Sequence, residues 1–412
     1  MSSTPRTRLV NPWLGTYFGI FVSLFAALVL MVMIFEQLGV AGRTLSLAML
    51  AGPILLFAAI GIAAWTEQPA EYFSSGRRVP AFFAGTGIAV STVGATGIVA
   101  GTGLFFINGF DAWAISIGGI AGCVAMAVLI APFYRKFGAY SVPSFLGRRF
   151  DSRPVRIVAA ALMAMPMLLV AVAEFRIGAF ALGWLTGMSP RVGAAVIAVA
   201  IVITVALGGM RSLTWSGTAQ GLVVLLAIVV PTAMVAVMLT NLPLPQFSYG
   251  PVLRGLGRLE AQQGVPIPIL SPLAFGLAGP GLEPLARRFA TPFGSLGHMS
   301  FILTTFTVML GIAAAPWLLP RTTTTPGVYD VRKSLGWSVV LLGIVAMTIS
   351  AAAVFMRDLV MDTLVSQNRN ALPPWFTSLV QAGLAGLDSR GVRPPLGAFS
   401  FHRDAVLFTL PA

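Results

Sequence analysis

Two adjacent hydroxyl side chains, Ser91 and Thr92, lie near the middle of an apolar segment that is rich in glycine. The segment, residues 81–111, carries no charge before its last residue and contains seven glycines. Lipid cannot hydrogen-bond exposed backbone, so a span this weakly helical needs protein or a water-lined cavity around it. The segment either packs closely through glycines such as the GxxxG pair Gly97 and Gly101, or is a broken helix that binds ions or substrates. Composition leaves both interpretations open.

A second pair of candidate residues, Glu174 and Arg176, is flanked by the apolar runs LLVAVA and IGAFAL. A charge inside a membrane span costs at least about 2.5–3.5 kcal/mol, so such a side chain is expected to face the bundle interior and to have a partner. Arg176 either binds a substrate carboxylate through its planar guanidinium or extends to the outer membrane surface, with Glu174 in a structural network.

A third group of polar residues, Thr304 and Thr305, lies in an apolar segment that ends near Pro316. These hydroxyls either line a solute path or bond back to the helix backbone. The single cysteine, Cys123, and the two histidines suggest neither a disulfide nor a metal cluster. The sequence contains no Gly-Lys phosphate loop, Ser-His-Asp set or paired carboxylates, so it predicts no enzyme and no cofactor other than a coupling ion.

The composition indicates an integral membrane protein. Hydrophobic residues make up 57% and charged residues 9%, whereas a soluble chain has about 25% charged residues; the mean hydropathy is +0.88. The net charge of +13 gathers at the ends of apolar segments, which is typical of membrane topology rather than of nucleic-acid binding. Apolar segments predict about nine spans, at residues 13–35, 45–65, 81–111, 112–133, 157–185, 192–207, 213–239, 296–319 and 335–355.

The distribution of Lys and Arg predicts a cytoplasmic N-terminus. In that orientation the short outer loops hold Arg43 and Arg191. The inner loops hold the remaining short-loop charges, namely Arg6, Arg8, Arg77, Arg78, Arg135, Lys136, Arg148, Arg149, Arg153, Arg156, Arg211, Arg321, Arg332 and Lys333. Two long loops, 241–295 and 357–403, are then extracytoplasmic. The inner stretch PRTTTTPGVYDVRKS is expected to be a solvated helix start, with Asp330 near the helix N-terminus.

Three stretches of the chain form recognisable motifs, namely AEYFSSGRRVPAFFAGTGIAVSTVGATG, LGGMRSLTWSGTAQG and MLGIAAAPWLLPRTTTTPGVYDVRKSLGW. They resemble the sodium/solute symporter family, in particular its acetate and monocarboxylate permease branch, and the resemblance covers most of residues 71–355. It implies an all-α polytopic membrane bundle of LeuT-type inverted-repeat architecture, in a cell membrane such as a bacterial inner membrane. The implied organisation is two peripheral spans (1–66), a complete first repeat (67–240), an outer loop (241–295) and an incomplete second repeat (296–412). On this basis the chain is expected to be truncated on its C-terminal side.

The resemblance also implies a binding site and favours the broken-helix interpretation of residues 81–111. The main-chain carbonyls of Val90 and Val93 would bind Na⁺. The aspartate of the family's WTD element is Gly217 here, and an acid that several members keep in the broken helix is Thr92. The substrate would be contacted by Ser91, Thr92, Thr304 and Thr305, with Glu174 or Arg176 setting charge selectivity.

Symport of a small organic anion, such as acetate or another monocarboxylate, with Na⁺ or H⁺ is therefore the main functional hypothesis. The alternative is a transporter-derived sensor or accessory membrane subunit that does not translocate, and a third is a structural subunit of a larger complex. The partners implied by the main hypothesis are the anion, the coupling cation and the lipid bilayer.

Overall fold

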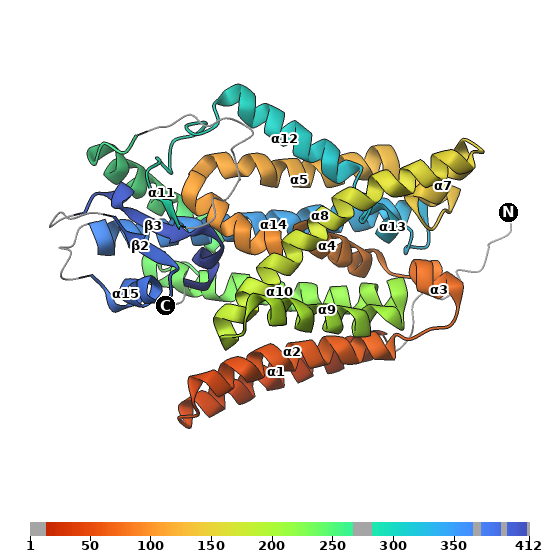
Figure 1. Ribbon diagram of the computed structural model, residues 1–412, viewed down its shortest axis with the longest axis horizontal. Coiled ribbons are helices and arrows are strands. Elements are labelled where there is room, and N and C mark those ends of the chain that lie inside the picture. The colour runs from red at the N-terminus through yellow and green to blue at the C-terminus, as the bar shows by residue number, and fades with distance from the viewer. Residues whose placement is uncertain (1–13, 267–281, 366–371, 389–393, 410–412) are drawn as a thin grey trace. The chain divides into compact units, whose positions relative to one another are not determined.

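The protein, described by a computed structural model, is built from apolar helices (Figure 1). The structure describes residues 14–266, 282–365, 372–388 and 394–409, so Arg6 and Arg8 of the topology prediction lie outside the described residues. The helices are α1 (Leu14–Gln37), α2 (Gly42–Ala63), α3 (Pro69–Ser74), α4 (Ala81–Asn108), α5 (Trp113–Ala125), α6 (Ala131–Phe137), α7 (Val142–Arg149), α8 (Arg153–Thr186), α9 (Pro190–Ala206), α10 (Gly209–Thr240), α11 (Pro245–Gln262), α12 (His298–Ala313), α13 (Leu319–Thr322), α14 (Val328–Val360), α15 (Pro374–Gln381) and α16 (Val406–Thr409).

Every predicted span falls on a helix. Among the described residues, six helical stretches are long and apolar enough to cross a membrane, and α9 and α12 are shorter apolar helices. One stretch, Ala81–Phe137, joins two predicted spans through the turn Gly109–Ala112. The most apolar part of α1 is 0% buried, whereas that of Val328–Val365 is 67% buried. The helix α1 therefore buries little of its surface in this structure, whereas α14 is a core element.

The chain forms two compact units that alternate along the sequence. The first comprises Met1–Thr92, Val124–Val223 and Ala313–Val339, and the second comprises the three intervening and following segments, Val93–Cys123, Val224–Ile312 and Val340–Ala412. Several boundaries fall inside helices, so these units are not the sequential segments predicted, and the division into repeats stays a prediction. Within the first unit α1 packs on α2, α2 on α8 and α9, and α7 on α8 (Figure 1).

The predicted outer loops contain regular structure that the sequence did not indicate. Residues 241–295 include the helix α11 and the strand β1 (Leu282–Pro284), and residues 357–403 include α15, β2 (Ala385–Leu387) and β3 (Phe399–His402). The strands form an antiparallel sheet in the order β1-β3-β2. Phe399 and Phe401 point to its buried face and pack against Phe376 of α15. The fold is thus mostly helical, with a small sheet in the second unit.

A buried ion pair fastens this part of the second unit to α14. Arg357 and Glu260 have side chains that are 0% and 1% exposed, and Nη2 of Arg357 lies 3.0 Å from Oε1 of Glu260. The same Nη2 donates to the carbonyl of Arg287 at 2.7 Å. The other carboxylate oxygen of Glu260 accepts from the backbone N–H groups of Phe289 (2.9 Å) and Ala290 (3.3 Å). One carboxylate therefore connects α11, α14 and the chain after β1.

We predict that Glu260→Ala lowers the free energy of unfolding by about 3–5 kcal/mol, because it leaves the Arg357 guanidinium buried without a counter-charge. Thermal unfolding in mild detergent, followed by tryptophan fluorescence, would measure the loss. Arg258→Ala, an exposed change on the same helix, is the control and should have little effect. The double variant Glu260→Ala/Arg357→Leu should recover part of the loss. Equal stability of Glu260→Ala and the control would contradict the assignment.

Candidate functional site

The helix α4 is interrupted at Gly94. This residue has φ 61° and ψ −176°, a backbone conformation that is outside helical geometry and is essentially restricted to glycine. The interruption lies one residue beyond the predicted break at Val90 to Val93. Just before it, the hydroxyls of Ser91 and Thr92 donate to the carbonyls of Gly87 and Ile88, each at 2.8 Å. These hydroxyls thus bond to backbone carbonyls one turn earlier in α4.

Accessibility changes sharply at this point of α4. All residues from 84 to 89 are buried, whereas none from 90 to 98 is buried. A continuous apolar helix in the core of a bundle is expected to keep some residues buried on every turn, which nine consecutive positions of α4 do not. An interrupted helix at membrane depth is tolerated where it lines a cavity, and the exposure of residues 90–98 fits that condition.

A second interruption follows α12. This helix ends at Ala313, residues 314–318 are not helical, and the short helix α13 begins at Leu319. Pro316 lies in the non-helical stretch, where its ring removes a backbone donor and prevents helix continuation. The predicted span 296–319 therefore ends earlier than expected and is followed by a separate helical turn.

One hydrogen bond within the first unit joins the non-helical stretch 314–318 to the part of α4 that precedes Gly94. The indole Nε1 of Trp317, in the non-helical stretch, donates to the carbonyl of Ser91 at 3.2 Å. Nearby, Ser338 of α14 donates to the carbonyl of Gly85 at 2.8 Å, and Thr218 of α10 donates to that of Phe83 at 3.3 Å. Side chains of three other segments thus bind main-chain carbonyls of the first half of α4.

The stretch 320–334 divides into two parts: its threonines are buried, whereas Tyr329 and Arg332 at the start of α14 are exposed, as expected for a solvated helix start. The four threonines Thr322 to Thr325 are between 0% and 2% exposed. Each hydroxyl donates to the carbonyl three residues earlier, at 2.6 to 3.3 Å. Such local bonds satisfy hydroxyls that would otherwise be costly to bury. The helix start near Asp330 is as predicted, because α14 begins at Val328.

The other predicted site residues are distributed over two elements. Glu174 and Arg176 lie on α8, where Glu174 is half-buried and Arg176 is exposed. Thr304 and Thr305 lie on α12 in the second unit, and the hydroxyl of Thr305 donates to the carbonyl of Phe301 at 2.9 Å. For Thr305 this geometry matches the alternative in which the hydroxyl bonds back to the helix backbone.

Residues that the sequence reasoning did not single out complete the first-unit site. Trp317 and Arg321 lie within the third of the stretches that resemble the symporter family. The sequence-based prediction counts Arg321 only among the charges of the inner loops. A Cβ placed on Gly87 or Gly217 would lie 3.7 or 3.9 Å from Nη1 of Arg321. The guanidinium therefore lies beside glycines of α4 and α10. The signal for it was present in the sequence as a basic residue directly after an interrupted apolar segment.

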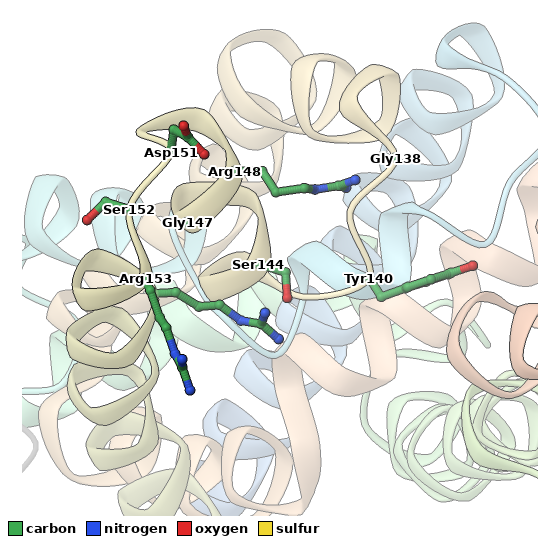
Figure 2. Close-up of a pocket in the computed structure, with 9 residues that line it drawn as sticks. Gly138, Tyr140, Ser144, Gly147, Arg148, Asp151, Ser152 and Arg153 are labelled. Atoms are coloured by element: carbon green, nitrogen blue, oxygen red, sulfur yellow. The ribbon is translucent and has the colours of Figure 1, made fainter.

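A surface pocket of about 820 Å³ lies elsewhere in the first unit, at α7 and the start of α8 (Figure 2). It is basic, and the guanidinium carbon of Arg148 lies 5.0 Å from the ring centroid of Phe137. The lining residues are Gly138, Tyr140, Ser144, Gly147, Arg148, Asp151, Ser152, Arg153 and Arg156. No predicted ion or substrate residue lines this pocket, so it is distinct from the interrupted helices.

The known proteins that this chain resembles are symporters and transporters. Residues 72–244 match the model of the sodium:solute symporter family. An uncharacterized symporter of Cupriavidus necator is 24% identical over 87% of this chain and 64% of its own length. A monocarboxylic acid transporter of Corynebacterium glutamicum is 22% identical over 68% of this chain and 49% of its own length. The chain thus spans about two thirds of the length of the first relative and about half of the length of the second.

A solved structure supports the predicted fold class. A Na⁺-coupled sialic acid symporter, in a substrate-bound outward-open state, matches with a TM-score of 0.60 and 17% identity over 89% of this chain and 69% of that chain. At this identity the likeness concerns the fold, and it confirms the LeuT-type helical architecture. The matched family and the structural neighbour are transporters rather than enzymes.

We predict that Gly94→Ala destabilises the protein by about 1–3 kcal/mol, because a side chain at φ 61° and ψ −176° is strained. Thermal unfolding in detergent would measure the change. Gly119→Ala on α5 is the matched control, since no atom lies within 4 Å of the added carbon; it should be neutral or slightly stabilising. A Gly94→Ala variant as stable as the control would show that α4 is continuous at this position.

Proposed function

We propose that the protein carries out cation-coupled symport of a small organic anion, such as acetate or another monocarboxylate, by alternating access. The general function, cation-coupled solute symport, is supported by the match of residues 72–244 to the sodium:solute symporter family. The choice of a monocarboxylate is supported by the relative from Corynebacterium glutamicum. The setting would be a cell membrane, with the N-terminus in the cytoplasm.

The observation that carries the proposal is the hydrogen bond between two interrupted helical segments, from Trp317 to the carbonyl of Ser91 at 3.2 Å. Broken helices in paired positions are the structural device by which many transporters place carbonyls and helix ends around ions and substrates. The accessible positions 90–98 of α4 provide the surface on which such binding would occur.

The ion and substrate assignments extend this proposal to particular atoms. Na⁺ would bind the main-chain carbonyls of Val90 and Val93, since carbonyl oxygens suit a hard monovalent cation and do not depend on side-chain identity. The hydroxyls of Ser91 and Thr92 would contact the substrate by accepting a second hydrogen bond, because each already donates to a carbonyl. Thr304, Thr305 and Glu174 would complete the substrate path.

A sensor or accessory subunit that does not translocate is the second candidate. The observation that favours it is the identity of two residues: Thr92 stands where several members of the resembled family keep an acid, and Gly217 stands at the aspartate of its WTD element, although the acetate branch lacks the same acids. Fewer negative charges beside the path would weaken the attraction for a coupling cation. The two candidates differ in one measurable property, namely solute accumulation.

Transport in proteoliposomes tests the proposal. We expect the reconstituted protein to accumulate labelled acetate or pyruvate when an inward gradient of Na⁺ or of protons is applied, and to stop when that gradient is dissipated. Empty liposomes and liposomes with a heat-unfolded sample are the controls. No accumulation under either gradient would contradict symport and favour the sensor.

Removal of the Trp317 donor tests the contact between the interruptions. Trp317→Phe keeps an aromatic ring but loses the N–H group, and we expect gradient-driven uptake to fall roughly two- to tenfold, which corresponds to a hydrogen bond of about 0.5–1.5 kcal/mol. Trp65→Phe, at an exposed tryptophan, is the matched control and should transport normally. Equal uptake by both variants would show that the hydrogen bond has no part in transport.

A further inference from the structure

Arg321 differs from the other enclosed arginines in having no protein partner. Arg357 pairs with Glu260, Arg211 pairs with Glu71 at 2.6 Å, and Arg135 donates to the carbonyls of Thr325 and Pro326 at 2.9 and 2.6 Å. Within the described ranges, no hydrogen bond or ion pair involves the guanidinium of Arg321. Five N–H donors are therefore available at one half-buried position.

The guanidinium of Arg321 keeps its charge although the side chain is half-buried. Burial lowers the pKa of Arg321 to about 10, so the side chain remains a cation at neutral pH. A partly buried cation without a counter-charge is less stable than one in water. Since no carboxylate of the described residues pairs with Arg321, a counter-charge from outside the protein would stabilise it.

Two glycines flank the guanidinium of Arg321. Its Nη1 lies beside Gly87 of α4 and Gly217 of α10, which have no side chains, and a Cβ on either would lie at ordinary contact distance, 3.7 or 3.9 Å. All three residues belong to the first unit.

We propose that Arg321, together with the glycine-lined space at Gly87 and Gly217, forms a binding site for the carboxylate group of a small organic anion. A guanidinium binds a carboxylate through two parallel hydrogen bonds, which favours a planar carboxylate over a spherical halide. Arg321 then takes the charge-selecting role that the sequence assigned to Glu174 or Arg176, and Arg176 is an exposed residue of α8. The identification of this anion as the transported solute rests on the proposed symport.

Direct binding to the purified protein in detergent tests the site without requiring transport. Acetate would be titrated while the fluorescence of the tryptophans, including Trp317 four positions from Arg321, is recorded, and isothermal calorimetry would give the affinity independently. We expect saturable acetate binding by the wild-type protein. Arg321→Gln should bind acetate about tenfold more weakly or worse, because it loses a charged donor pair. Arg191→Gln removes an exposed charge from α9, away from both the Arg321 site and the basic pocket, and is the control.

A pair of substitutions at Gly217 gives a test that does not remove the arginine. Gly217→Asp places a carboxylate beside Nη1 of Arg321, whereas Gly217→Asn adds nearly the same volume without the charge. We expect acetate to bind the aspartate variant about tenfold more weakly than the asparagine variant, because the internal carboxylate occupies the guanidinium. This comparison remains informative if Arg321→Gln fails to fold.

Several results would overturn the site. These are no saturable acetate binding by the wild-type protein, equal affinity in Arg321→Gln, equal affinity in the two Gly217 variants, or saturation by chloride with no competition from acetate. Binding that depends on Arg321 without uptake in proteoliposomes would leave the site intact and refute symport. Uptake that is unaffected by Arg321→Gln and Gly217→Asp would leave symport intact and refute the site.

Discussion

Backbone that leaves helical geometry inside an apolar bundle must find other hydrogen-bond partners, and this constraint organises the first unit. The chain leaves helical geometry at Gly94 and again at residues 314–318. The indole of Trp317, in the second of these stretches, donates to the carbonyl of Ser91 in the first part of α4. An irregular segment would not be a stable membrane element by itself. Partners supplied by other segments allow such backbone to remain irregular, which is the condition for lining a path rather than merely filling a core.

The same constraint explains the density of hydroxyl groups around these segments. Ser91 and Thr92 bond to carbonyls four residues earlier, and Thr322 to Thr325 bond to carbonyls three residues earlier. A hydroxyl that donates within its own segment still has lone pairs that can accept a second bond. Serine and threonine can therefore satisfy the backbone of an irregular segment and remain available to a solute. Aliphatic residues would give neither property.

The sequence predicted the helices well and the irregular parts poorly, for physical reasons. A membrane core requires about 20 apolar residues per helix, so each span appears as a long continuous run. The strands β1 and β3, in contrast, are three and four residues long and pair across distant parts of the chain, Leu282 opposite His402. Strands this short, paired with distant segments, leave little recognisable pattern in the local sequence. The position of the α4 break within one residue was also beyond sequence reasoning, because seven glycines were candidates and packing determines which one takes φ 61°.

The roles of the charged residues were harder to predict from the sequence than the positions of the helices. A basic residue near the end of a span satisfies the rule for membrane topology whether it lies in water or against protein. Sequence position alone therefore favours Arg176, inside an apolar run, as the anion-binding residue, and it assigns Arg321, at the end of a run, to topology. The structure reverses their environments: Arg176 is exposed on α8, while Arg321 lies beside Gly87 and Gly217 without a carboxylate partner. What separates a topological charge from a binding charge is whether its neighbours neutralise it. That property arises when α4, α10 and α13 come together, and no stretch of the sequence taken alone contains it.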